Sequence, residues 1–244
     1  MTNIKNIAAT LAVLGTSSLS IIHFKGYKVE KILGSIYSVS FSNKTDLWKT
    51  FVRYQEYYES PKYHGKSFTL KEFKSWYTQE YGGGEFTYED DWAAFNIPSF
   101  VIDECRNAKD LNKYDTIMQD IYKEIGLSDF YLLGVTDLGS DEDLPHEIAH
   151  GLFFTDEEYR NLATDLVDNM PEKDYEKIRS YLIGVGYCEH VLIDEIQAYM
   201  ATGVSEKMNF SEKLHKPFIS LFIETKLKII KRESCEESKL PKKE

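Results

Sequence analysis

A short stretch near the middle of the chain carries the residue types of a hydrolytic metal site. Residues 143–152 read D-L-P-H-E-I-A-H-G-L, which contains His146, Glu147 and His150 in the order H-E-x-x-H. Residues four apart lie on one face of a helix, so both imidazoles can bind one metal ion. Two neutral imidazoles suit Zn²⁺, and the adjacent carboxylate can accept a proton from a water whose pKa the metal has lowered. The stretch therefore predicts a zinc site with Glu147 as general base.

A third ligand must come from elsewhere, because a catalytic zinc usually has three protein ligands and one open position. Glu195 lies in the apolar stretch 191–198, where a carboxylate is costly to bury unless a cation pairs with it. Asp194 is the next candidate, and it could instead orient an imidazole from behind. Asp156 follows His150 by six residues but also suits the start of a capped helix. We favour Glu195 as the metal ligand and keep Asp194 and Asp156 as alternatives.

Two further residues could stabilise an oxyanion during hydrolysis. Tyr199 lies one helical turn after Glu195 and could donate its hydroxyl. His190, five residues before Glu195, could also reach the site. We name Tyr199 and His190 as candidate catalytic residues, with Tyr187 and Tyr159 as weaker ones, although such residues are more often part of the packing or the surface.

The metal-binding stretch also has the pattern of a buried helix. Leu144, Ile148 and Leu152 recur every four residues and form an apolar stripe for a core. Asp143 suits the N-cap, and Pro145 falls within the first turn, where its missing N–H costs little. The predicted helix therefore begins at its own ligands.

The remaining pattern predicts a mostly helical domain with a small sheet. Alternating or short apolar runs predict strands at 34–41 and 130–135. Two capping boxes, beginning at Thr69 and Thr155, mark helix starts. Apolar periodicity predicts helices near residues 43–58, 69–81, 99–108, 110–124, 155–170, 172–182, 188–200 and 211–230. The predicted fold class is α+β, with the H-E-x-x-H helix at its centre.

Composition and charge exclude several classes of protein. The net charge is −11 and no basic stripe precedes the C-terminal tail, which argues against nucleic acid as a partner. Three widely spaced cysteines do not form a disulfide framework. We expect one domain over residues 25–230 and a charged, disordered tail over 231–244. Residues 1–24 have the outline of a leader but suit a buried first element slightly better, so we favour a cytoplasmic location and keep secreted and membrane-anchored locations as alternatives.

Two other segments have alternative interpretations. The aromatic segment 86–100 could line a substrate cleft, but packing against the core is the more common role of such residues. The acidic loop 137–143 could hold calcium, although it lacks the EF-hand spacing.

The chain resembles a zincin metallopeptidase, and within that group it is most similar to the gluzincins. The matching residues are His146, Glu147, His150 and Glu195, and the resemblance extends over roughly 130–203. It implies a catalytic zinc, a downstream Glu ligand and a strand before the metal helix that forms the rim of a substrate cleft. Where the best-known members have an Asp four residues after the ligand Glu and an Asn before it, this chain has Tyr199 and Asp194.

These observations predict a zinc metallopeptidase that cleaves a peptide or protein substrate. Glu147 would take a proton from the attacking water and pass it to the leaving amine. A zinc hydrolase of a non-peptide amide is the first alternative. A binding protein that keeps the metal without turnover is the second, and the presence of Glu147 argues against it.

Overall fold

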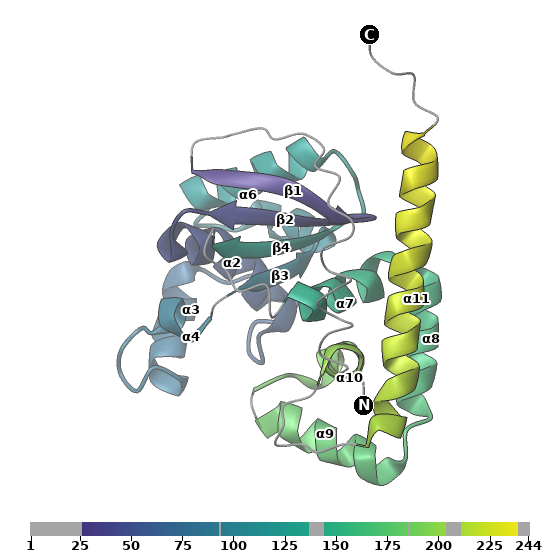
Figure 1. The fold of residues 1–244 in the computed structure, drawn as a ribbon. Coiled ribbons are helices and arrows are strands. Elements are labelled where there is room, and N and C mark those ends of the chain that lie inside the picture. The colour runs from purple at the N-terminus through teal and green to yellow at the C-terminus, as the bar shows by residue number, and fades with distance from the viewer. Residues whose placement is uncertain (1–25, 93, 137–143, 185, 204–210, 239–244) are drawn as a thin grey trace.

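The computed structural model describes residues 26–92, 94–136, 144–184, 186–203 and 211–238. Within these residues the chain folds into a four-stranded mixed sheet with helices packed on both faces (Figure 1). Helices supply most of the regular structure, which confirms the predicted α+β class. None of the described helices is long and apolar enough to cross a membrane. The leader-like segment and the acidic loop 137–143 fall outside the described residues, so both interpretations stay predictions.

Each of the two inner strands of the sheet has one parallel and one antiparallel neighbour. Its order is β1-β2-β4-β3, with β1 at Tyr27–Leu33, β2 at Ile36–Phe41, β4 at Tyr131–Thr136 and β3 at Phe95–Pro98. β2 runs parallel to β4, and the other two pairs are antiparallel. The strand predicted at 130–135 is therefore the inner strand β4, and β1 and β3 form the two edges of the sheet among the described strands.

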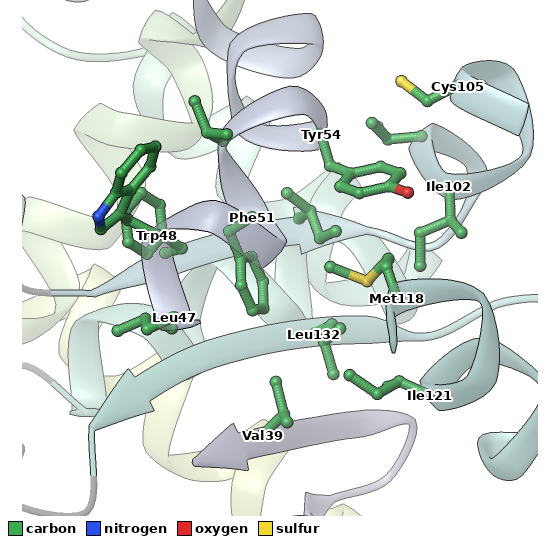
Figure 2. Packing of buried hydrophobic residues seen from close by; sticks show 14 of the residues in the cluster. Val39, Leu47, Trp48, Phe51, Tyr54, Ile102, Cys105, Met118, Ile121 and Leu132 are labelled. Carbon is green, nitrogen blue, oxygen red and sulfur yellow. The ribbon is translucent and has the colours of Figure 1, made fainter. Parts of the chain in front are cut away.

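One face of the sheet carries a core made with helices from the first half of the chain. These helices are α2 (Lys44–Glu59), α3 (Leu70–Glu80), α4 (Tyr88–Asp91), α5 (Phe100–Glu104) and α6 (Lys113–Ile125), with a 3₁₀ turn at Cys105–Asn107. Figure 2 shows Val39 and Leu132 of the sheet pointing toward Phe51 of α2 and Ile121 of α6. Aromatic rings fill much of this core, which accounts for many of the chain's tyrosines and phenylalanines.

The opposite face carries a second core made with helices from the second half of the chain. They are α7 (Leu144–Thr155), α8 (Glu157–Asp168), α9 (Glu172–Gly184), α10 (Leu192–Thr202) and α11 (Glu212–Glu237), with a 3₁₀ turn at Glu189–Val191. Ile36, Tyr131 and Leu133 of the sheet join this core. In Figure 1, α7 lies between the sheet and α10, while α11 runs along α8. The predicted metal helix is thus central to the second core.

Two strands were not predicted from the sequence. β1 pairs with β2 through a hairpin whose turn contains Gly34 in the left-handed region, with φ of 57°. β3 lies inside the aromatic segment 86–100, whose Phe95 and Ile97 are buried in the first core. That segment packs against the core as expected, but four of its residues do so as an edge strand.

Two predictions about helix ends are wrong. Asp156, rather than Thr155, caps α8, because the Asp156 side chain accepts a hydrogen bond from the Tyr159 N–H at 2.9 Å. The Thr155 hydroxyl instead donates to the Gly151 carbonyl one turn earlier. α11 continues to Glu237, so residues 231–237 of the charged tail are helical rather than disordered.

Candidate metal centre

Two packed helices bring the predicted ligands together. α7 carries His146 and His150 one turn apart on the same face, and α10 carries Glu195 opposite them. The two imidazole Nε2 atoms lie 3.1 Å apart. Glu195 Oε1 lies 3.7 Å from His150 Nε2, and Glu195 Oε2 lies 3.9 Å from His146 Nε2. One ligand atom from each of the three residues therefore falls within 4.8 Å of the others.

These separations fit a single small cation. Ligands bonded to tetrahedral Zn²⁺ at about 2.0–2.2 Å lie roughly 3–4 Å from one another. Other first-row divalent ions accept the same nitrogen and oxygen donors, so the geometry is compatible with zinc without being specific to it. Among the described residues, this is the only group of three or more potential His, Cys, Asp or Glu ligands so arranged.

The carboxylate of Glu195 provides an independent test of whether a cation fits. Its side chain is almost fully buried, and Oε2 has no hydrogen-bond partner among the described residues. Burial raises the pKa of Glu195 to about 8, and the nearby Asp194 and Glu147 carboxylates add to the shift, while His150 opposes it. A buried, unpartnered carboxylate oxygen is costly, and a bound cation would remove that cost.

The two imidazoles differ in electrostatic environment. Burial, with the neighbouring His150, lowers the pKa of His146 to about 3, so His146 has the neutral form that a metal requires. Burial also lowers the pKa of His150, but Asp194 and Glu195 outweigh it and raise that pKa well above the ordinary value. The two Nε2 atoms lie within hydrogen-bond distance of each other, and a bound metal ion would take the place of the proton between them.

A buried network behind His150 fixes its orientation. Asp194 Oδ1 lies 2.8 Å from His150 Nδ1, so the ring carries its proton on Nδ1 and turns Nε2 toward the centre. Gln197 donates to the same Asp194 oxygen at 2.9 Å, and Tyr159 donates to Gln197 Oε1 at 2.7 Å. Of the three candidates for the third ligand, the geometry favours Glu195. Asp194 instead holds a ligand from behind, and Asp156 caps α8.

Glu147, the predicted general base, points from α7 toward the edge strand. Its Oε2 accepts a hydrogen bond from Asn96 Nδ2 at 2.8 Å. Asn96 Oδ1 in turn accepts from the Tyr131 hydroxyl at 2.6 Å. Asn96 and Tyr131 were not predicted as site residues. The sequence does show an isolated polar residue between Phe95 and Ile97. That pattern points to a site residue only when β3 is known to pack beside α7.

The two predicted oxyanion donors lie in different surroundings. The Tyr199 ring packs against the His146 ring, with centroids 4.6 Å apart. Burial raises the pKa of both Tyr187 and Tyr199 and the Glu195 charge strengthens both shifts, so these two tyrosines lie near the candidate ligand Glu195. His190 is exposed and stacks on His64 with centroids 3.5 Å apart. Its Nε2 lies 3.1 Å from the Tyr58 carbonyl at the end of α2, so His190 engages that helix end rather than the ligand group.

The C-terminal turn of α2 adds one more carboxylate near the ligands. Burial raises the pKa of Glu59 well above the ordinary value, and the Glu195 and Glu147 charges strengthen the shift. Gln55 donates a hydrogen bond to Glu59 at 2.6 Å. Neither Glu59 nor Glu195 forms an ion pair with a Lys or Arg of the described chain. The excess of acidic groups favours a cation at this position.

No protein-family model, curated protein sequence or solved structure matches this chain. The interpretation of the site therefore depends on its residues and their geometry.

Proposed function

We propose that the chain is a zinc-dependent metallopeptidase in which His146, His150 and Glu195 hold the metal. The observation that carries the proposal is the convergence of these three side chains around the unpartnered, buried Oε2 of Glu195. A second observation supports hydrolysis rather than metal storage, since Glu147 follows His146 on the same helix and bears a carboxylate.

Each residue of the site has a separate role in the proposed hydrolysis. When bound, the divalent ion supplies Lewis acidity that activates a water and polarises a carbonyl. Glu147 takes a proton from the attacking water and delivers it to the leaving nitrogen, so no proton has to come from solvent. Asp194 keeps His150 in the ligating tautomer. Tyr199, packed on His146, is the candidate donor to the developing oxyanion.

The edge strand favours a second candidate, a zinc hydrolase that acts on a short or non-peptide amide. Extended substrates commonly pair with an exposed strand through its N–H and C=O groups. At the open edge of β3, the Asn96 N–H already donates to Gln55 Oε1 at 3.0 Å, and Pro98 has no N–H. These two positions therefore offer a substrate no backbone N–H. Their lack of donors disfavours a long peptide substrate that pairs with β3 along its whole length.

A comparison of two metal-loaded proteins tests the proposed function. Wild type and Glu147→Gln, each loaded with zinc, are incubated with a peptide library and with a panel of acylated amino acids and small amides. We expect wild-type cleavage and a loss of at least about 10³-fold in Glu147→Gln, because the amide side chain does not accept a proton. Glu157→Gln, the same change at an exposed position of α8, should retain full activity.

The pattern of products separates the candidates. Cleavage within peptides supports the peptidase, whereas turnover confined to small amides supports the second candidate. Equal activity in wild type and Glu147→Gln, or no product in any metal-loaded sample, contradicts both.

A further inference from the structure

The edge strand β3 projects a single polar side chain toward the metal helix. Phe95 and Ile97 are 2% and 0% exposed and point into the first core. Asn96, between them, projects from the opposite face, where α7 packs. The β3–β4 register pairs Asn96 with Leu133, and Tyr131 lies two residues along on the same face of β4. The pleat of the sheet thus brings Asn96 and Tyr131 together beneath Glu147.

The hydrogen bonds fix which way the Asn96 amide faces. Nδ2 donates to Glu147 Oε2 at 2.8 Å, and Oδ1 accepts from the Tyr131 hydroxyl at 2.6 Å. A reversed amide would place Oδ1 against the Glu147 carboxylate, where two acceptors repel. Tyr131 is itself 1% exposed, and its ring packs near Phe154 of α7. The amide therefore has one favourable orientation.

The backbone of Asn96 is held from the other side of the strand. Its N–H donates to Gln55 Oε1 at 3.0 Å, and Gln55 is buried on α2. Asn96 is thus anchored by α2 through its main chain and by β4 through its side chain. Such double anchoring keeps a side chain close to one position, which is what a group that orients a catalytic residue requires.

We propose that Asn96 is a positioning residue for Glu147, with Tyr131 as its support. The inference rests on the proposed function, because it assigns Asn96 the task of holding the general base in its reactive rotamer. Asn96 fixes Oε2 and thereby the plane of the Glu147 carboxylate relative to the ligands on the same helix. Displacing a reacting group by about 1 Å costs on the order of 10²-fold in rate, so this hydrogen bond affects turnover rather than substrate binding.

A double-mutant cycle on the zinc-loaded protein tests the role. Asn96→Ala should lower kcat by about 10- to 100-fold and leave KM within about 3-fold of wild type. Introduced into Glu147→Gln, the same change should produce no further loss, since Asn96 acts only through Glu147. Tyr131→Phe should give a smaller loss of the same kind. Additive losses, a KM effect alone, or unchanged kcat in Asn96→Ala would overturn the proposal.

A second variant guards against loss of folding. Asn96→Asp has the same shape and keeps the acceptor for Tyr131, but it sets a carboxylate against Glu147 in place of a donor. We expect kcat to fall at least as far as in Asn96→Ala, with a circular dichroism spectrum at the assay temperature that matches wild type and shows that the variant is folded. If Asn96→Asp keeps wild-type kcat, the hydrogen bond to Glu147 has no positioning role.

A binding measurement separates this proposal from the proposed function. Acetohydroxamate is titrated into the Co²⁺-loaded protein and followed by visible absorption, which needs no turnover. Glu147→Gln and Asn96→Ala should each weaken binding by about 10-fold, and the double variant should be no weaker than Glu147→Gln. This pattern supports positioning even if no substrate is cleaved, in which case only hydrolysis is refuted. Undiminished binding in Asn96→Ala refutes positioning even where hydrolysis is found.

Discussion

At the scale of single residues, the site combines candidate metal ligands with groups that hold them in place. His146, His150 and Glu195 converge, while Asp194 and Asn96 each contact one functional side chain from behind. The contact of Asp194 with His150 Nδ1 fixes the tautomer, so the ligating nitrogen is Nε2. Groups of this kind typically change metal affinity by 10- to 100-fold when removed.

Asp194→Asn tests this assignment. An amide at this position can still contact His150 but no longer bears the charge that stabilises its Nδ1–H, so we expect zinc affinity to fall by about 10- to 100-fold. Competition with a chromophoric chelator gives the dissociation constant. Asp156→Asn is the matched control, because Asn also caps helices well and should leave affinity unchanged. If zinc binding is lost in Asp156→Asn but not in Asp194→Asn, Asp156 would become the favoured third ligand.

The candidate ligand set could be predicted from sequence, and so could a role for Asp194 behind an imidazole, whereas the residues that contact Glu147 could not. Two histidines four apart are a local pattern, and a carboxylate within an apolar helix is a local anomaly. Asn96 and Tyr131 acquire their roles only from strand register, which depends on pairings between segments far apart in the chain. Gln197 could have been noticed as a polar residue inside α10, but its partner Tyr159 lies on another helix.

At the scale of elements, close packing of α7 on the sheet sets the position of Glu147. A Cβ at Gly151 would approach Ile36 Cδ1 of β2 to 2.6 Å, so the helix packs where only glycine fits. A similar approach occurs on the other face, where a Cβ at Gly134 would lie 2.5 Å from the Phe51 ring. Neither glycine could be identified from sequence, because the side chains that leave no room for a Cβ, Ile36 and Phe51, come from distant segments of the chain.

Gly151→Ala should therefore push α7 away from β2. Overpacking of this kind costs about 1–3 kcal/mol, and we expect the midpoint of urea unfolding to fall accordingly. The shift of α7 should also weaken zinc binding. Gly184→Ala in α9 is the control, since a Cβ there meets nothing within 4 Å and alanine favours the helix. Equal stability of the two variants would show that α7 can move without strain.

At the scale of the whole molecule, two cores meet at the sheet, and the candidate metal ligands lie on helices of the second core. The first core also contains a buried carboxyl group, Glu56, which accepts a hydrogen bond from the Tyr88 hydroxyl at 2.8 Å. Burial raises the pKa of Glu56 to about 7, although hydrogen bonds from Tyr88 and Ser60 oppose the shift. The folded chain therefore holds this proton more tightly than the unfolded chain does.

Folding stability should depend on pH through this group. Because the folded pKa of Glu56 lies above the unfolded value, its contribution is fully present below about pH 4.5 and is lost as pH rises toward about 7. The loss of folding stability is on the order of 3 kcal/mol. In urea unfolding at pH 5 and pH 8, Glu56→Gln should become more stable relative to wild type at the higher pH. A constant difference between the two proteins would refute the buried, protonated state, and Glu157→Gln gives the surface reference.

Metal stoichiometry tests the central claim most directly. Wild type, Glu195→Gln and Glu147→Gln are incubated with zinc, dialysed extensively and measured by elemental mass spectrometry alongside protein concentration. We predict about one zinc per chain in wild type and in Glu147→Gln, and below about a tenth in Glu195→Gln, since Glu195 is the only ligand among the two substituted glutamates. A wild-type chain without zinc, or a Glu195→Gln chain that retains it, would contradict the account.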